Sequence, residues 1–416
     1  MRRLVVRNVG PIKSVDIKLN RVNVFIGPQS SGKSTLAKII SFCTWLEKNN
    51  NLTERAVVDG LINRLKRHHR LSSFFDQSSS ILYIGENIAF AYNWKTALPI
   101  PKRFIPLNYE SLNHGEVVFY RPTRVVNPKV IYIPAERNFV SSVSNLKDYS
   151  ESDDSLQSFI EDWYDAKRNY TSEKPLDVFN LGASYYYNPK IDVDYIQLSD
   201  VKKKKILLND SSSGLQSVVP LYVLIEWMSS GIYEQTKPLS PEENQRIQEM
   251  LNSISGNTVN NSYEEKLLQK IKAMAADKLY THTQFIVEEP EQNLFPKTQM
   301  DFLYYLLTSI NRRKKHELVI TTHSPYILYA LNNCMLAYLV KDNLDDSLRE
   351  SLAAARASID PNEVSVWSIK DGCLRNSNND IHKTIQDARG LIRKNYFNDI
   401  MSSVMGDFSQ LLEFDE

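Results

Sequence analysis

The chain of 416 residues is 42% hydrophobic and 24% charged, a composition that excludes a disordered or fibrous protein. Its 50 basic and 49 acidic residues nearly cancel, which excludes an overall positive field, so contact with nucleic acid would need a local patch. The three cysteines form no C-x-x-C pair, so we expect neither zinc nor disulfides. The N-terminus lacks an apolar signal segment, and the longest apolar stretch, Val218 to Met228, is too short for a bilayer. We therefore expect a cytoplasmic protein without a membrane span.

The first 26 residues predict two or three strands with a turn at Gly10-Pro11, and they lead directly into a glycine-rich loop. Residues 27 to 34 match the pattern G-x-x-x-x-G-K-[ST], and apolar residues at helical spacing follow from Leu36 to Leu46. A strand, this loop and a helix in that order predict a site for a nucleoside triphosphate, formed by Gly27, Pro28, Gln29, Ser30, Ser31, Gly32, Lys33, Ser34 and Thr35.

The chemistry of this loop follows from its residue types. Gly27 and Gly32 let the backbone curl with several N–H groups pointing inward, and the helix that follows adds the positive end of its dipole. Lys33 supplies a mobile charge for the β- and γ-phosphates, and Ser34 offers a hydroxyl to Mg²⁺. We therefore expect ATP as the ligand and Mg²⁺ as the metal.

The middle of the chain is less regular and predicts two excursions from a core. Residues 48–125 combine a basic helical piece with short aromatic strands and are interpreted as an inserted lobe. Residues 236–279 are polar and helical and are interpreted as an exposed helical excursion. The predicted core is therefore discontinuous and comprises residues 1–47, 126–235 and 280–416.

Two carboxylates follow an apolar run in the third part of this core. The segment Phe285 to Val287 predicts a buried strand, and Glu288 and Glu289 stand at its carboxyl end, where ligands collect in open α/β sheets. This is the Walker B pattern. Because successive side chains of a strand point apart, we assign Glu288 to the metal and Glu289 to the attacking water.

A third buried strand, Leu318 to Thr321, is followed by Thr322 and His323, and then by Ser324 and Pro325, which are typical of the start of a helix. A histidine at this position can donate a hydrogen bond to a γ-phosphate, so we interpret His323 as a catalytic residue that senses the nucleotide. The alternation of strands and helices predicts an α/β fold with parallel strands.

A further segment, Ser212-Ser213-Gly214-Leu215-Gln216, lies between the glycine-rich loop and the Walker B pattern. Together, these motifs resemble the ABC-type ATPases in content and order. Within that class the chain resembles a bacterial anti-phage group that includes the ATPase portion of the overcoming-lysogenization nucleases, PtuA of Septu and AriA of PARIS. The resemblance implies a P-loop NTPase head of the ABC type with a mixed sheet. The elements that carry it lie in residues 1–45 and 125–416.

The resemblance also implies how two copies meet. The Ser-Gly element is the signature motif of the class, in which Ser212, Ser213, Gly214 and Gln216 contact ATP bound to the opposite subunit. A homodimer or higher homo-oligomer follows, with a separate effector protein, a nuclease or toxin, as a further partner. From the residues alone, Ser213 is expected to cap a helix that begins near Leu215, leaving free N–H groups for a phosphate.

Two features of the class stay open. It uses a glutamine that couples Mg²⁺ to the inserted lobe, and no glutamine of this chain is assigned to it. Glu136 and Arg137 resemble a recurrent Ala-Glu-Arg element of the subgroup without an assigned role.

Two other functions compete with a regulatory ATPase. A nuclease of the overcoming-lysogenization type needs a C-terminal metal-binding domain with a glutamate after its first strand. The candidate strand, Leu336 to Asp342, ends without one, and the segment after it is short. A transporter motor would need a membrane partner, for which the chain offers no segment.

Overall fold

The computed structural model describes residues 2–48, 60–106, 115–121, 127–143, 146, 154–199, 204–234, 280–376 and 378–414. The predicted helical excursion, residues 236–279, lies outside these residues. None of the helices within them is long and apolar enough to cross a membrane.

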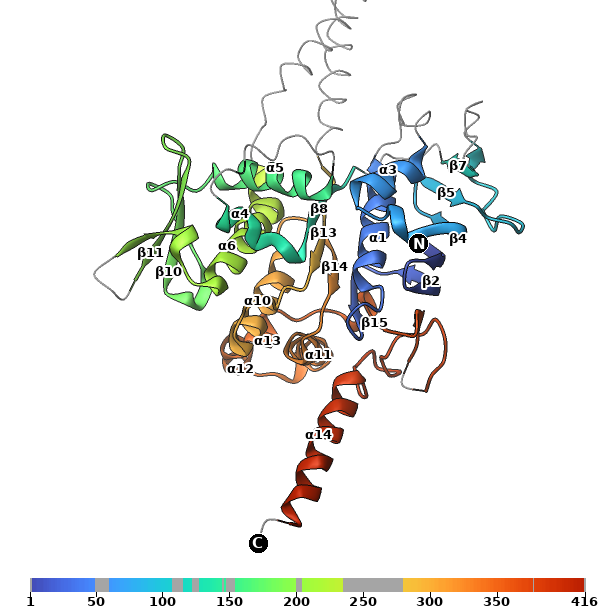
Figure 1. Cartoon of the computed structure of the whole chain (residues 1–416). Helices are drawn as coiled ribbons and strands as arrows, with labels where there is room; N and C mark the ends of the chain where they lie inside the picture. The colour runs from blue at the N-terminus through green and yellow to red at the C-terminus, as the bar shows by residue number, and fades with distance from the viewer. Residues whose placement is uncertain are drawn as a thin grey trace, which may run out of the picture.

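The described residues form one twelve-stranded mixed sheet and one four-stranded antiparallel sheet (Figure 1). The large sheet contains, in chain order, β1 (Arg2–Val9), β2 (Ile12–Leu19), β3 (Val22–Ile26), β4 (Phe75–Ile84), β5 (Ile88–Tyr92), β6 (Ile105–Pro106), β7 (Glu116–Tyr120), β8 (Lys129–Ile133), β13 (Thr283–Glu288), β14 (Glu317–Thr321), β15 (Val364–Lys370) and β16 (Cys373–Leu374). The small sheet contains β9 (Leu176–Asp177), β10 (Ala183–Asn188), β11 (Val193–Leu198) and β12 (Lys205–Leu207).

The helices cover both faces of the large sheet and its carboxyl edge. They are α1 (Lys33–Lys48), α3 (Leu61–His68), α4 (Phe139–Ser142), α5 (Ser155–Lys167), α6 (Ser213–Glu226), α7 (Ile232–Glu234), α10 (Pro296–Ser309), α11 (Pro325–Leu339), α12 (Asp346–Ser351), α13 (Ala353–Arg356) and α14 (Tyr396–Leu412).

The centre of the large sheet is parallel. Strands β15, β3, β14, β13 and β8 are neighbours in that order and run in the same direction. Strands β3 and β13 are buried throughout, because parallel strands joined by helices are covered on both faces. Antiparallel strands continue the sheet on one side, so the predicted α/β fold with a mixed sheet is confirmed.

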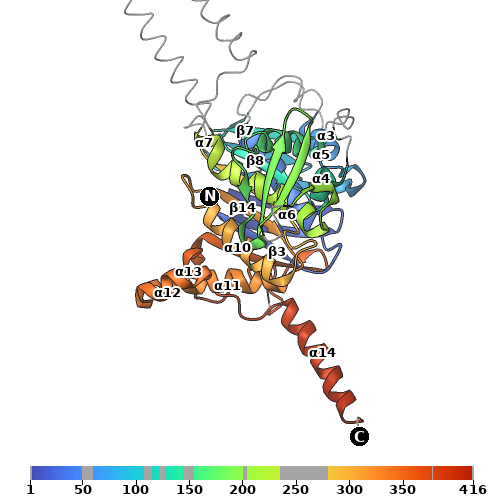
Figure 2. The same ribbon diagram turned by 90° about the vertical axis from the view of Figure 1, so that its left-hand side faces the viewer.

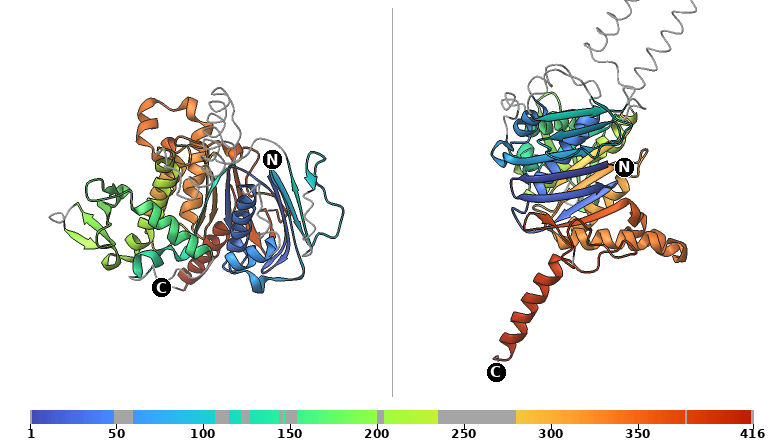
Figure 3. Two further views of the ribbon diagram at one scale, coloured as in Figure 1. Left: turned by 90° about the horizontal axis from the view of Figure 1, so that it is seen from above. Right: turned by 90° about the vertical axis from the view of Figure 1, so that its right-hand side faces the viewer.

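Alternate side chains of the parallel strands point into two different cores. Val24 and Phe285 pack with α6 on one face, whereas Phe25 and Ile286 pack with α1 on the other. Helix α1 lies between the parallel strands and the antiparallel strands β1, β2, β4 and β5, as the view from above shows (Figure 3). The helices that follow the two nucleotide motifs, α1 and α6, are therefore on opposite faces of the parallel core.

The described part of the predicted inserted lobe continues the large sheet. Strand β4 pairs with β1, and β5, β7 and β6 follow it outward. The helical piece expected near residues 61–70 is α3. How the chain divides into domains stays a prediction, but residues 75–120 extend the core sheet where they are described.

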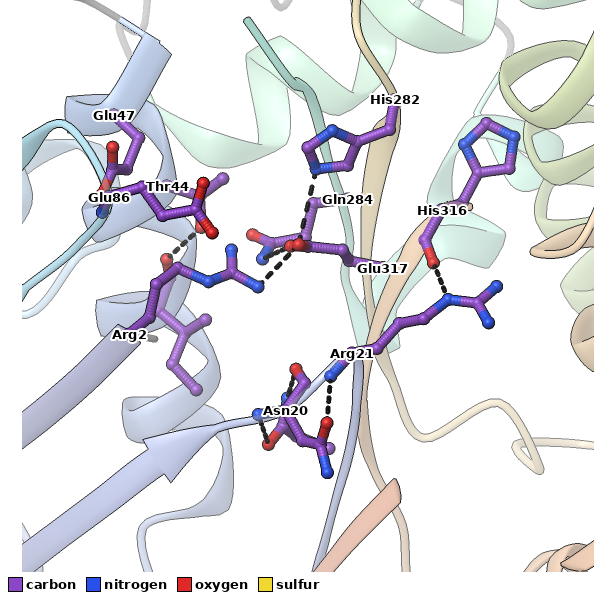
Figure 4. Close-up of polar contacts among 12 residues, drawn as sticks. Arg2, Asn20, Arg21, Thr44, Glu47, Glu86, His282, Gln284, His316 and Glu317 are labelled. Atoms are coloured by element: carbon purple, nitrogen blue, oxygen red, sulfur yellow. Dashed lines mark hydrogen bonds and ion pairs between the residues drawn. The ribbon is translucent and has the colours of Figure 1, made fainter. Parts of the chain in front are cut away.

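A partly buried ion pair holds the antiparallel strands to the parallel core at its amino edge (Figure 4). Arg2 of β1 lies 2.7 Å from Glu317 at the start of β14, and Gln284 of β13 donates a hydrogen bond of 3.0 Å to the same carboxylate. Burial raises the pKa of Glu317, but the charge of Arg2 and the hydrogen bonds outweigh it and bring the pKa to about 2. These contacts hold β1 against β13 and β14 at the edge of the sheet opposite the phosphate loop.

Two local predictions are wrong. The candidate nuclease strand at Leu336 to Asp342 is instead the end of helix α11, which runs to Leu339, followed by a 3₁₀ turn. Leu336 and Leu339 are each 40% exposed, and the buried face of α11 ends at Met335. A short apolar run has no period that distinguishes a helix from a strand. The cap of α6 is Ser212 rather than Ser213, because the Ser212 hydroxyl accepts from the N–H of Leu215 at 3.4 Å.

Candidate nucleotide site

The glycine-rich loop joins the end of β3 to the start of α1. Gly27 and Gly32 have φ angles of 147° and 104°, and Ser30 between them has a φ of 59°. A side chain at Gly27 would meet the carbonyl oxygen of Ile369 at 2.4 Å, so only glycine fits this turn. The loop thus has the curled backbone that the phosphate-binding interpretation requires.

Lys33 stands at the first position of α1, and its ammonium group lies within the loop. It donates hydrogen bonds to the carbonyl oxygens of Gly27 at 3.0 Å and Pro28 at 2.7 Å. Burial lowers the pKa of Lys33 to about 8, although the negative charges of Glu289, Glu291 and Glu288 act to raise it. Three acidic groups from the Walker B segment are therefore close to the predicted phosphate-binding lysine.

Glu288 ends strand β13 and has the donor chemistry of a magnesium ligand. Its side chain is only 4% exposed, and its Oε1 atom has no hydrogen-bond partner. Burial raises the pKa of Glu288, and the charge of Lys38 and the neighbouring hydroxyl groups of Tyr132 and Ser34 lower it. The predicted pair of ligands, Ser34 and Glu288, therefore lies together, and the Oε1 atom of Glu288 is buried without a hydrogen bond.

This donor set fits Mg²⁺ bound with a nucleotide better than a metal cage made of protein alone. Within the described residues, no group of three or more His, Cys, Asp or Glu side chains forms a metal site. Mg²⁺ commonly uses one or two protein ligands and completes its shell with phosphate oxygens and water. Ser34 and Glu288 can supply such a partial shell.

Glu289 and His323 form a pair at the same edge of the sheet. The Nε2 atom of His323 lies 3.4 Å from the Oε1 atom of Glu289, and both side chains are about one third exposed, at 34% and 33%. The hydrogen bond from His323 lowers the pKa of Glu289, although burial raises it. Glu289 has a φ of 43°, an uncommon backbone conformation for a residue other than glycine.

Glu291, which the sequence did not single out, fixes the histidine loop. Its carboxylate accepts hydrogen bonds from the backbone N–H of His323 at 2.6 Å and from the Thr322 hydroxyl at 2.9 Å. Burial raises the pKa of Glu291, and the backbone bond from His323 lowers it. The available signal in the sequence was a third carboxylate two residues after Glu289, but only the fold shows that it faces the loop after the neighbouring strand β14.

Arg137, whose role the sequence left open, connects the Walker B turn to α6. Its side chain is fully buried and donates to the carbonyl oxygens of Glu288 and Glu289, each at 3.0 Å, and of Ser217 at 3.1 Å. Burial lowers the pKa of Arg137 to about 10, while the three nearby glutamates raise it. Arg137 is therefore a positioning residue that holds the two elements together.

Replacing Arg137 with methionine should lower the free energy of unfolding by on the order of 3 kcal/mol, because several buried carbonyl groups lose their donor at once. Equilibrium urea unfolding measures this change. The control is Arg168→Met at the exposed end of α5, which should shift stability by no more than about 0.5 kcal/mol. A loss below about 1 kcal/mol for Arg137→Met would show that the carbonyl groups find other donors.

The predicted signature residues form the first turn of α6. Ser212 and Ser213 are exposed, and Gly214 approaches the carbonyl oxygen of Asn293 so closely that an added Cβ would lie 3.1 Å from it. Gln216 is committed to its own subunit, since its amide donates to the carbonyl oxygens of Asn209 at 2.7 Å and Ser211 at 3.0 Å. The structure thus leaves the two serines available to an incoming phosphate and gives Gln216 a local structural bond.

No protein-family model and no curated protein matches this chain. Similar solved structures include the SMC head domain from Thermotoga maritima, which is 10% identical, with 79% of this chain and 90% of that chain covered and a TM-score of 0.35. The Smc head domain of Pyrococcus furiosus, with an extended coiled coil and bound to the C-terminal domain of ScpA, is 10% identical over 89% and 95% of the two chains, with a TM-score of 0.36. The recombination mediator protein RecF is 10% identical over 89% and 96%, with a TM-score of 0.35. These likenesses are distant and carry no conclusion about activity.

Proposed function

We propose that this chain binds and hydrolyses ATP as an ABC-type ATPase and closes as a head-to-tail homodimer over two nucleotides. One observation carries the proposal. Lys33, Glu288, Glu289 and His323, which lie in three separate parts of the sequence, converge at the carboxyl edge of the parallel strands.

Each group has a defined task in such a site. The loop amides and Lys33 bind the β- and γ-phosphates, and Ser34 and Glu288 hold Mg²⁺, which neutralises charge on the phosphate oxygens. Glu289 orients the attacking water and accepts its proton, which its lowered pKa permits at neutral pH. His323 donates a hydrogen bond toward the γ-phosphate from the position that Glu291 fixes.

The dimer follows from the position of the signature. Helix α6 packs on the face of the parallel core opposite α1, and the serines at its N-terminus are exposed. The first N–H groups of a helix bind anions well, and a second copy facing this edge would bring its own γ-phosphate there. Closure driven by two nucleotides then converts ATP binding into a rearrangement of the subunits.

The dimer is tested by mixing two inactive variants. Lys33→Ala removes the phosphate contact and keeps the signature, whereas Ser213→Arg blocks the signature and keeps the loop. If each site combines the loop of one copy with the signature of the other, an equal mixture contains one intact site in half of its dimers. Such a mixture should recover about one quarter of the wild-type turnover.

The mixture distinguishes the arrangements directly. If the signature acted within its own subunit, no combination of the two variants would contain an intact site, and the mixed sample would stay inactive. The control is a mixture of Ser213→Arg with a Lys33→Ala, Ser213→Arg double variant, which contains no intact site in either arrangement.

The resemblance of the motifs further supports a regulatory role, in which the ATPase senses a phage component and holds or releases a separate nuclease or toxin. Co-purification of the chain with the product of an adjacent gene, compared between wild type and Glu289→Gln, tests this role. Binding that does not depend on nucleotide state would contradict it.

The nuclease alternative receives no support from the described residues. The segment expected to begin its metal-binding domain is the end of α11 and the 3₁₀ turn after it. No group of three acidic, histidine or cysteine side chains that could hold a metal is present in the ranges that the structure covers. Cleavage of DNA or RNA by the purified protein with Mg²⁺ or Mn²⁺ would restore it.

A further inference from the structure

Helix α14 leaves the rest of the molecule at the edge of the sheet where the nucleotide site lies, and it points away from it in both side views (Figures 1 and 2). None of its residues is buried. Its first turn is nevertheless fixed. The side chain of Asn395 accepts from the N–H of Phe397 at 3.0 Å, and Asn398 donates to the hydroxyl of Tyr329 on α11 at 3.2 Å.

One side of α14 is apolar along its whole length. At 100° per residue, its large apolar side chains fall within about 140° of the helix circumference. We call this side the α14 stripe, and its residues are, from one edge to the other, Ile400, Leu411, Val404, Phe397, Phe408, Met401, Leu412 and Met405. The seven from Ile400 onward are 44–70% exposed.

The charges on α14 limit what the stripe can bind. Asp399 and Glu413 lie on the side opposite the stripe, Asp407 lies beside its edge next to Ile400, and no basic residue occurs within the helix. Just before the helix, Arg393 pairs with Asp387 and Lys394 lies 3.7 Å from Asp399. The apolar side of α14 is therefore not flanked by basic residues of its own helix.

We propose that the α14 stripe binds the same stripe of a second copy of this chain, with the two helices antiparallel. The apolar residues match about a two-fold axis near Val404 and Met405, which pairs Met401 with Phe408 and Phe397 with Leu412.

The available area suits such a pair. At about 100 Å² for each half-exposed large side chain, the stripe offers roughly 700 Å², close to the about 800 Å² per partner of a standard protein interface. A membrane containing acidic lipids fits less well, because the apolar side is not flanked by basic residues. This interface is separate from the ATP-dependent closure and needs no nucleotide.

Sedimentation of the full chain without nucleotide tests the proposal. Wild type should form dimers at micromolar concentration. Met401→Glu with Phe408→Glu should raise the dimer Kd at least about 100-fold, because two charges would be buried in the pair. The matched control, Ser402→Glu with Ser409→Glu, adds the same charges to the polar side and should remain dimeric with an unchanged or slightly raised Kd.

Cysteine cross-linking tests the direction of the helices, in a Cys373→Ser background that removes the only partly exposed native thiol among the described residues. Met405→Cys lies near its own copy across the two-fold axis and should cross-link under oxidation. Leu411→Cys should not, because an antiparallel partner places its copy about 20 Å away along the axis. Cross-linking at both positions would overturn the antiparallel arrangement.

Three results would overturn the proposal as a whole. The first is a wild type that is still monomeric at about 50 µM, roughly the range of weak interfaces. The second is a dimer whose Kd does not change in the stripe variant, Met401→Glu with Phe408→Glu. The third is binding of the wild type to vesicles of acidic lipid that the stripe variant abolishes. The head-to-tail ATP dimer is judged separately, by the mixing experiment, since that experiment needs ATP and this one excludes it.

Discussion

Replacement of Glu289 by glutamine is expected to lower the turnover of ATP hydrolysis by about 10²- to 10⁴-fold and to leave ATP binding intact. The amide keeps the size and the contact with His323 but cannot accept a proton from water. Steady-state release of phosphate measures the turnover, and equilibrium titration with a fluorescent ATP analogue measures the affinity.

The matched control is Glu161→Gln on α5, an exposed glutamate bonded only to its neighbour Gln157 among the contacts that the structure gives it. It should hydrolyse ATP at the wild-type rate. If Glu289→Gln also keeps the wild-type rate, the proton acceptor is another group, and Glu291 would be the next carboxylate to consider because it faces the same loop.

Lys33 should make ATP binding depend on pH above about 8. Burial keeps the pKa of the free lysine near this value, and the negative phosphates raise it in the complex, so binding takes up a proton between the two pKa values. The contribution of Lys33 to the apparent affinity for ATP should therefore be nearly constant below pH 8. Above it, the affinity should fall by up to about tenfold per pH unit.

Two variants isolate the lysine in titrations between about pH 7.5 and 9.5, a window around its lowered pKa. Lys33→Arg keeps its charge throughout and should bind with a nearly flat pH profile. Lys33→Ala should bind more weakly at every pH, by about 2–3 kcal/mol or roughly 30- to 150-fold, because it lacks the charged hydrogen bond to phosphate. An unchanged affinity for Lys33→Ala would contradict the site itself.

The local elements of the site could be predicted because each is written in neighbouring residues. The glycines of the loop, the apolar run before Glu288 and the Ser-Pro pair after His323 specify strand, turn and helix starts without any long-range information. The parallel core followed from their alternation. The helical turn at Leu336–Leu339 was missed because a short apolar run has no period that separates a strand from a helix.

The sequence by itself therefore determined which residues can bind phosphate and metal, since backbone freedom, charge and hydrogen-bonding capacity belong to single residue types. Only the tertiary structure decided what holds them in place. Arg137 meets the Walker B turn and α6, and Glu291 meets the loop of His323, across strands that are neighbours in the sheet and distant in the chain. Such partners are chosen by sheet order and burial, because a buried charge must find its acceptors wherever packing brings them, and no local pattern of residues encodes that choice.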